Sequence, residues 1–293
     1  MSEPEAARRR WMRWLGYGLG GVLLALAVGF AVSGVEWGVL RSASPWQFGA
    51  LAGLVVTNFV LTGLLFWSVT RTFDATPTVG PGRMIGLIAV SGLLNYVPVV
   101  RAGLWGRAAY LKKYHGLPVR QSLVVLGVVL VLTLIVVGGS GLVLLVCPPS
   151  WRWAVVAGGL LLATGSTSTL GKHLLRRQAK AGWTWVPLRG LDFAAAVGRL
   201  WLGMSIVGQS VGVADVAVLA SASLLVKIAG LTPNGLGLSE WVVVALSAVV
   251  TPIEASAAAA AALVDRGAEV LVSLVLGGGA LAWLRGGTPA GAE

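Results

Sequence analysis

The sequence predicts an all-α polytopic membrane protein with about six transmembrane helices and two opposed re-entrant helical hairpins. Of its 293 residues, 56% are hydrophobic and only 11% are charged, and the mean hydropathy is +0.84, whereas soluble domains carry roughly 25% charged residues. Several apolar runs reach the ~20 residues that cross a bilayer core of ~30 Å. Two apolar stretches, 92–107 and 227–241, are interrupted by proline and glycine and continue into charged residues. Paired interruptions in two halves are typical of transporter substrate sites.

The first two elements are expected to be full transmembrane helices at 14–35 and 46–70. Residues 1–13 form a cytoplasmic N-terminal segment with three consecutive arginines, Arg8 to Arg10. This start resembles a signal peptide, but the apolar run after it exceeds the roughly 7–15 residues of a signal-peptide core. We therefore expect the first helix to be retained as an anchor.

The next elements are a first hairpin at 84–117 and a full span at 121–146. The hairpin begins as an apolar stretch, but it contains Pro98 and ends in basic residues such as Lys112. Charged side chains are costly in the bilayer core, so this segment is not expected to cross it. An arm of about 14 helical residues rises only about 21 Å. The hairpin should therefore enter and leave on one face of the membrane.

The C-terminal half is expected to repeat this order. Full spans are predicted at 151–170, 191–213 and 253–284, with the second hairpin at 215–251. Proline and glycine interrupt this hairpin at 233–237, as they interrupt the first one. One transmembrane domain then covers residues 14–285, and a short tail follows at 286–293.

The distribution of Lys and Arg favours this topology. With the N-terminus inside, the outer segments carry only Arg41 and Arg152, and the basic loops lie on the inner side, as cytoplasmic loops usually do. Both termini are then cytoplasmic, and we expect the protein in the bacterial cytoplasmic membrane. The first hairpin opens to the cytoplasm and the second to the outside, which makes an inverted repeat. The alternative is that 216–231 and 238–263 are two full spans, which leaves charged residues in lipid.

Several other functions are disfavoured. A net charge of +11 would suggest nucleic acid in a soluble protein, but in a membrane protein basic residues mark inner loops that meet anionic lipid. Cys147 is the single cysteine, so no internal disulfide is expected. His115 and His173 lie in basic loops and do not form a set of metal ligands. We predict no metal, no cofactor and no nucleic-acid partner.

Five residues of the first hairpin are candidates for substrate contact or for its geometry: Asn95, Pro98, Arg101, Gly103 and Arg107. Proline removes a backbone donor and breaks a helix, and a glycine permits a tight turn, which we assign to Gly103. Asn95 can bond across the broken arm. Arg101 and Arg107 can each bind a phosphate with two parallel hydrogen bonds. The alternative is that both arginines extend to the inner interface.

The second hairpin supplies Pro233, Gly235 and Gly237 at its interruption, followed by Ser239 and Glu240. We expect Ser239 to cap the half-helix that follows. The N-terminus of that half-helix would present free N–H groups and a positive dipole end at membrane depth, which favours an anion. Glu240 either completes this cap or pairs with a cation in the substrate path.

The last span contains Asp265, Arg266 and Glu269. Asp265 and Glu269 are four residues apart and share a helix face, and Arg266 and Glu269 are three apart. Charges at this depth usually face a cavity or each other. Lys227 is a second deep cation and is expected to pair with one of these carboxylates. Arg199 is expected to extend to the inner interface. A closed ion cluster with a structural role is the alternative to a substrate site.

These residues also resemble a known family, the lysylphosphatidylglycerol synthase transmembrane-region family, also called flippase-like. Its first element is similar to Asn95, Pro98, Arg101, Gly103 and Arg107. Its second element is similar to Pro233, Gly235, Gly237 and Glu240, and an arginine of its last helices resembles Arg266. The resemblance covers roughly residues 46–284. It implies a polytopic inner-membrane protein that moves lipids between leaflets.

The chain departs from the family pattern in three places. Leu104, Trp105 and Gly106 stand where the family has an acidic residue, and 127–130 replaces an acidic–arginine pair. The sequence has no counterpart of the soluble aminoacyl-transfer domain that some members carry. Aminoacyl transfer is therefore not implied, and an enzyme is not expected.

The predicted function is transport of an anionic phospholipid or a polyprenyl-phosphate lipid between leaflets. The partners are membrane phospholipids or lipid-linked phosphate, and a homo-oligomer is compatible with the sequence. One alternative is a membrane enzyme that acts on a lipid-linked substrate through interfacial acids such as Asp74 and Asp192. The other is a non-transporting membrane scaffold.

Overall fold

The computed structural model describes residues 22, 25, 26, 29, 43–73, 79–96, 102–148, 150–152 and 185–286. The expected spans 14–35 and 151–170 fall almost entirely outside these residues, as do the segment 1–13 and nearly all of the tail. Pro98 and Arg101 also lie outside them. Throughout the described part the secondary structure is helical, without strands, as the sequence predicted.

The first half of the described chain contains two long helices on either side of two short ones. In order they are α3 (Pro45–Phe73), α4 (Pro81–Leu94), α5 (Ala102–His115) and a continuous helix made of α6 (Val119–Thr133), the π-helical turn η1 (Leu134–Gly138) and α7 (Gly139–Val146). Pro81 stands at the start of α4, where its missing N–H costs nothing. The long helices match the spans expected at 46–70 and 121–146 within a few residues.

The second half has the same order of long and short helices. It comprises α9 (Trp185–Ile206), α10 (Val213–Ala229), the 3-10 turn η3 (Pro233–Gly235), α11 (Leu238–Val250) and α12 (Ala255–Gly286). The span expected at 191–213 is shifted, because α9 begins six residues earlier. Arg189, which precedes the expected span, pairs with Asp192 one turn further along α9, so the helix accommodates both charges.

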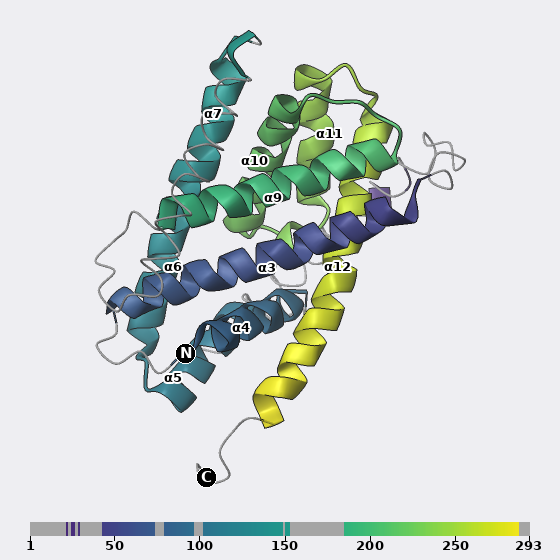
Figure 1. Ribbon diagram of the computed structural model, residues 1–293. Coiled ribbons are helices and arrows are strands. Elements are labelled where there is room, and N and C mark those ends of the chain that lie inside the picture. Colours follow the sequence, from purple (N-terminus) through teal and green to yellow (C-terminus); the bar gives the residue numbers. More distant parts are fainter. Residues whose placement is uncertain are drawn as a thin grey trace, which may run out of the picture.

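Helices of the two halves pack on each other. α3 packs against α9, α4 against α12, and α10 against α7, while α4–α5 and α10–α11 form adjacent pairs. Figure 1 shows that α3 and α9 lie side by side and run in opposite directions. The helix α6–α7 and α12 also run in opposite directions, on opposite sides of the molecule (Figure 1). The first short helix of each half therefore packs against a long helix of the other half: α4 packs against α12, and α10 packs against the α7 part of the helix α6–α7.

Three described helices are long and apolar enough to cross a membrane: Pro45–Thr72, Val119–Val146 and Ala255–Arg285. α9 has 22 residues but carries Arg189, Asp192 and Arg199. α4 and α11 are apolar but have only 14 and 13 residues. The structure is thus an all-helical protein with three helices suited to a bilayer, and the six spans and re-entrant hairpins stay predictions.

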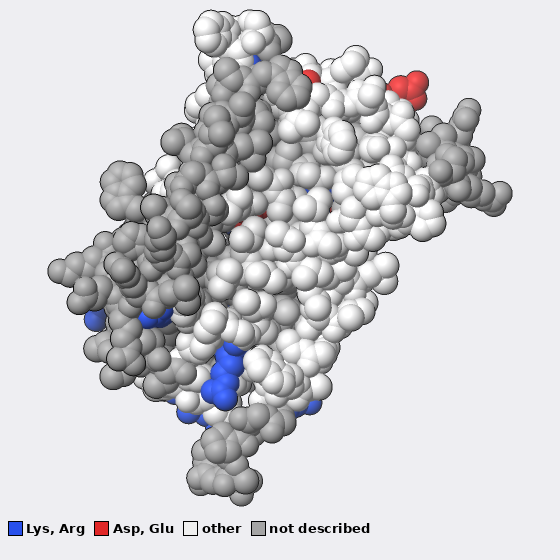
Figure 2. Space-filling model, viewed as in Figure 1, with Lys and Arg blue, Asp and Glu red and all other residues white. Residues whose placement is uncertain are grey.

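The basic surface is concentrated at one end of the bundle. Basic residues occur in the last turns of α3, α5 and α12, including Arg71, Lys112, Lys113 and Arg285. Figure 2 shows Lys and Arg at the lower end of the molecule and a broad uncharged surface above them. Apolar side chains such as Leu142, Val249 and Val275 are exposed on the described surface. This distribution suits an apolar band flanked by a basic face.

A triple-glycine run in α12 provides a test of how α4 and α12 pack. A Cβ on Gly277 would lie 2.7 Å from Leu93 Cβ and 2.9 Å from the Ala89 carbonyl oxygen, whereas Gly278 and Gly279 have nothing within 4 Å. Gly277→Ala should lower stability by about 1–3 kcal/mol because the helices must separate. Gly278→Ala should leave the melting temperature unchanged or raise it, because alanine is the better helix former. Thermal melts in detergent measure the melting temperatures of both variants. Equal shifts in melting temperature for Gly277→Ala and Gly278→Ala would contradict the close packing of α4 on α12 at Gly277.

Candidate functional site

The interruption of the second hairpin has a backbone geometry that requires small residues. α10 ends at Gly230 with φ 66°, and three further residues with positive φ follow: Asn234 (50°), Gly235 (73°) and Gly237 (76°). A Cβ on Gly235 would lie 2.7 Å from Lys227 Cγ. Glycine adopts such conformations without steric cost. The helix break predicted at Pro233, Gly235 and Gly237 is therefore present, and the chain turns back tightly on α10.

The half-helix after this turn starts differently from the prediction. Gly237 is the N-cap of α11, and no side chain caps it. Ser239 lies inside the first turn, where its Oγ donates a hydrogen bond to Glu240 Oε2 at 3.0 Å. The prediction that Ser239 caps the helix is wrong, because Gly237, two residues earlier, takes the N-cap position and α11 begins at Leu238. Ser239 instead orients the Glu240 carboxylate.

Glu269, near the middle of α12, is the hub of a buried charged cluster. Its carboxylate is 2.7 Å from Lys227 Nζ, 3.0 Å from Arg199 Nη2 and 3.4 Å from Arg266 Nη1. Lys227 was expected to pair with one of the deep carboxylates, and it does. One carboxylate thus joins three cations from α9, α10 and α12.

Arg199 does not extend to the membrane interface. Its residue exposure is 7%, and its guanidinium bonds Asp265 through two contacts, Nε–Oδ1 at 2.8 Å and Nη2–Oδ2 at 3.0 Å. The prediction is wrong because Asp265 and Glu269 present two carboxylates one turn apart to the same guanidinium. A fork with two parallel hydrogen bonds is a strong form of this ion pair.

Arg266 connects the cluster to the second hairpin. Its Nε forms an ion pair with Glu240 Oε1 at 3.2 Å, and its Nη2 donates to the Asn234 carbonyl oxygen at 2.6 Å. Arg266 and Glu240 are 4% and 3% exposed. Glu240 thus pairs with the cation Arg266, and Arg266 holds the turn of the hairpin against α12.

The tips of both hairpins meet at Glu269. Tyr96, directly after α4, donates its hydroxyl to Glu269 Oε1 at 3.4 Å. Asn234, in the turn of the second hairpin, donates its Nδ2 to the same oxygen at 3.3 Å. The Arg266 guanidinium carbon lies 5.5 Å from the Tyr96 ring centre. Two interruptions about 140 residues apart in the chain therefore converge on one carboxylate of α12.

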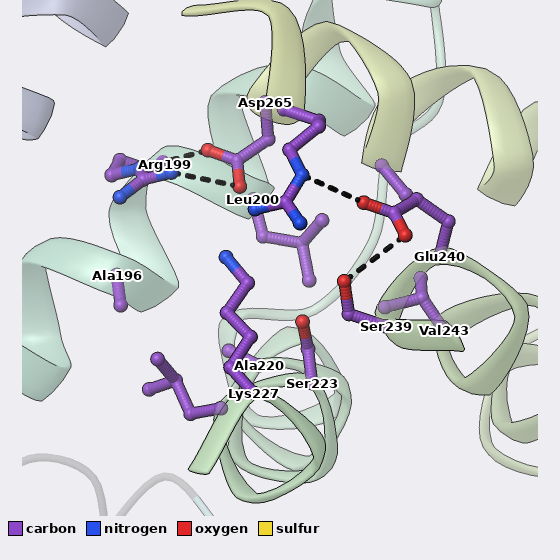
Figure 3. A pocket seen from close by; sticks show the side chains of 13 residues that line it. Ala196, Arg199, Leu200, Ala220, Ser223, Lys227, Ser239, Glu240, Val243 and Asp265 are labelled. Atoms are coloured by element: carbon purple, nitrogen blue, oxygen red, sulfur yellow. Dashed lines mark hydrogen bonds and ion pairs between the residues drawn. The ribbon is translucent and has the colours of Figure 1, made fainter. Parts of the chain in front are cut away.

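The cluster is balanced in charge and borders a pocket. Its cations are Arg199, Lys227 and Arg266, and its carboxylates are Glu240, Asp265 and Glu269. Figure 3 shows Lys227 directed toward the space beside Arg199 and Asp265, with Ser239 and Glu240 on another side. The pocket has about 450 Å³ of space between its atoms, part of it open to the outside. Among the described residues no group of His, Cys, Asp or Glu is arranged to hold a metal ion.

A second polar group extends the cluster between α3 and α9. Arg199 Nη1 donates to Asn58 Oδ1 at 3.3 Å, and Asn58 Nδ2 donates to Asp192 Oδ1 at 3.0 Å. Asp192 also accepts a hydrogen bond from Thr62 and pairs with Arg189. α3 and α9, the two helices that pack most extensively between the halves, thus share a polar network. Sequence analysis missed this network. An asparagine at the middle of an apolar span is the signal that could have revealed Asn58.

The first hairpin differs from the prediction at Gly103. This residue lies in the first turn of α5, not in a tight turn. A Cβ there would collide with the Ser91 carbonyl oxygen of α4, and Ser91 Oγ donates to the Gly103 carbonyl oxygen at 2.9 Å. Asn95 forms the C-terminal cap position of α4. Gly103 therefore permits α4 and α5 to approach closely, which is the usual role of small residues between membrane helices.

The structure divides the predicted site residues into two groups. Lys227, Ser239, Glu240, Asp265, Arg266 and Glu269 lie together in the charged cluster, beside the turn that contains Pro233, Gly235 and Gly237. Arg107 lines a separate pocket and stacks on Phe66. Sequence analysis did not include Tyr96 or Asn234; both stand directly in an interruption, which is the signal that could have identified them.

Comparisons with known proteins add no functional information. No protein-family model, no curated protein and no solved structure matches the chain. The resemblance to the flippase-like family therefore stays a prediction, carried by the residues quoted above.

Proposed function

We propose that this chain is a membrane transporter that moves an anionic phospholipid or a polyprenyl-phosphate lipid between the leaflets of the bacterial cytoplasmic membrane. One observation carries the proposal. Tyr96 and Asn234, at the tips of the two broken hairpins, both donate to the same buried carboxylate, Glu269. Ionisable residues inside a membrane mark substrate and ion pathways, and broken helices meet at the substrate site of many transporters.

The membrane arrangement we propose has six spans, two re-entrant hairpins and both termini in the cytoplasm. Burial and the neighbouring Arg83 charge lower the pKa of His115 below its usual range. Arg83 is at the start of α4 and His115 is at the end of α5, so the two ends of the first hairpin lie close together. Arms of about 14 residues rise about 21 Å, less than the ~30 Å core. These facts favour a hairpin that returns to its own side.

The charge balance of the cluster suggests how a phosphate is accepted. A charged lipid head costs at least about 3 kcal/mol at the centre of a bilayer even on the most permissive scales. Lys227 and Arg266 can bind a phosphate only when Glu269 releases them, because each now contacts that carboxylate. Movement of Glu269 away from these cations leaves a net positive cluster for the head, while the acyl chains stay in lipid.

Lipid transfer in reconstituted vesicles tests the proposal. Vesicles that contain the folded protein should move a labelled anionic lipid between leaflets faster than protein-free vesicles. Lys227→Met should reduce the rate about tenfold or more, because a charge-assisted contact to phosphate is worth about 1.5–3 kcal/mol. The matched control is Lys113→Met, the same change at an exposed position of α5.

Two results of this assay would count against transport. Wild-type protein that melts cooperatively in detergent but gives no transfer above empty vesicles would contradict the proposal directly. Equal rates for wild type, Lys227→Met and Lys113→Met would remove the charged cluster from the mechanism. Melting curves of both variants separate a loss of transport from a loss of folding.

The enzyme alternative has less support than the sequence suggested. It requires acidic groups accessible at the interface, and Asp192 was one of its two candidates. Asp192 is 5% exposed and is held by Asn58, Thr62 and Arg189. Asp74 lies outside the described residues. Asp192 therefore acts in packing between α3 and α9, and its replacement would disturb the fold under either function.

A further inference from the structure

A second pocket lies between α4, α5 and the C-terminal part of α12, apart from the charged cluster. It has about 790 Å³ of space between its atoms, part of it open to the outside. Five of its eleven lining residues are leucine or valine: Leu87, Val90 and Leu94 of α4 and Leu281 and Leu284 of α12. Polar groups reach it from Arg107, Tyr110 and Tyr114 on α5 and from Arg285 on α12. The pocket thus combines an apolar wall with a cationic and phenolic side.

Arg107 is a buried cation in this pocket. Its residue exposure is 9%, and its guanidinium carbon lies 3.9 Å from the ring centre of Phe66. Within the described part of the chain no carboxylate forms an ion pair with it and no acceptor bonds it. Stacking occupies one face of the guanidinium, whereas its N–H donors point outward in the plane. Among the described residues these donors therefore have no acceptor.

A buried cation without a carboxylate partner is costly unless an anion completes it. Lys112 and Lys113 are in the last turn of α5 and Arg285 is in the last turn of α12, and both helices line this pocket. Basic clusters at a membrane surface attract anionic lipid heads. The apolar wall formed by α4 and α12 fits a hydrocarbon chain better than it fits a free ion. Charge and wall chemistry together point to an amphiphile with an acidic head.

We propose that this pocket binds an anionic phospholipid from the leaflet at the basic face, with its phosphate on Arg107 and the upper part of an acyl chain against Leu87 and Leu281. The pocket would be an entry site for transport, and this role rests on the proposed function. Binding itself does not require transport. The binding proposal and the transport proposal can therefore be disproved independently, because lipid binding is measured in detergent, without a vesicle or a membrane gradient.

Gly106 offers a way to block the pocket without altering its charge. It lines the pocket next to Arg107, and a Cβ built there lies 3.4 Å from Leu94 Cδ1. That distance is close to ordinary van der Waals contact, so a Cβ itself needs little adjustment. A larger side chain would extend into the space that we assign to the lipid. Gly106→Phe should therefore exclude the ligand while Arg107 stays in place.

The experiment measures binding of dioctanoyl phosphatidylglycerol to the purified full chain in a non-ionic detergent by titration calorimetry. Arg107→Gln should weaken the dissociation constant about tenfold or more, because a charged donor to phosphate is lost. Arg107→Lys should weaken it less, because lysine keeps the charge but loses the fork. Gly106→Phe should abolish binding. Arg120→Gln, at an exposed position of α6 in the same basic region, should bind as wild type does.

Separate arms distinguish the possible ligands. Dioctanoyl phosphatidylcholine should bind more weakly than phosphatidylglycerol, because its choline adds a positive charge beside Arg285. Inorganic phosphate should not compete at equimolar concentration. Equal phosphatidylglycerol affinity in wild type and Arg107→Gln would overturn the proposal, and so would inorganic phosphate that binds as tightly as the lipid. If Arg107→Gln does not melt cooperatively and is therefore misfolded, the Gly106→Phe variant alone tests the proposal. Phosphatidylglycerol affinity equal to that of the wild type in Gly106→Phe would then overturn the proposed binding site.

Discussion

Glu269→Gln should be among the most destabilising single substitutions in the described chain, with an expected loss of about 3–5 kcal/mol in the free energy of unfolding. The substitution keeps the shape of the side chain but removes its charge. Three buried cations then face two carboxylates, where the native cluster has three of each. The cost comes mainly from cations left without compensation, because an unpaired buried charge is far more expensive than a lost pair.

A double variant separates charge balance from the loss of individual contacts. Lys227→Met with Glu269→Gln leaves two cations and two carboxylates in the cluster. We expect the double variant to be more stable than Glu269→Gln alone, even though it has lost more side-chain contacts. Urea or thermal unfolding in detergent measures the difference. Glu254→Gln serves as the control, because Glu254 is exposed before α12 and should change stability little. A double variant with a lower free energy of unfolding than both single variants would contradict the argument that charge balance stabilises the cluster.

Features of the fold that depend on local chemistry were predictable from the sequence. Proline and glycine at 233–237 predicted the break between α10 and α11, because these residues disfavour a continuing helix. The apolar runs at 46–70 and 121–146 predicted α3 and the helix α6–α7, because they match the thickness of a bilayer. The pairing of Lys227 with a carboxylate was also predictable, since a deep lysine needs a counter-charge.

Long-range pairings were not predictable in the same way. Arg199 is 66 residues from Asp265 in the chain, and its position in α9 is compatible with either an interface or a buried partner. Only the packing of α9 on α12 decides between them. Gly103 illustrates the same limit, because a glycine after a proline break suits a tight turn as well as a close helix contact. The contact with Ser91 depends on the return of α5 along α4.

Single-cysteine labelling should show that each hairpin begins and ends on one side of the membrane. The background is Cys147→Ser, which removes the chain's single cysteine. Cysteines then replace Arg83 and Lys113 at the ends of the first hairpin, or Ser210 and Glu254 at the ends of the second, all of which are exposed. An impermeant maleimide added to intact spheroplasts should label positions 210 and 254 and should not label 83 and 113.

The expected pattern follows from helix length and charge. α4 and α5 have 14 residues each, so each rises about 21 Å and neither crosses a core of ~30 Å alone. Permeabilised spheroplasts should label all four positions, which controls for accessibility, and the cysteine-free background should show no labelling. If Arg83→Cys and Lys113→Cys label from different sides, one arm crosses the bilayer. The tip of that hairpin would then not reach Glu269 from the basic side, and the proposed meeting of two hairpins at a transport site would fail.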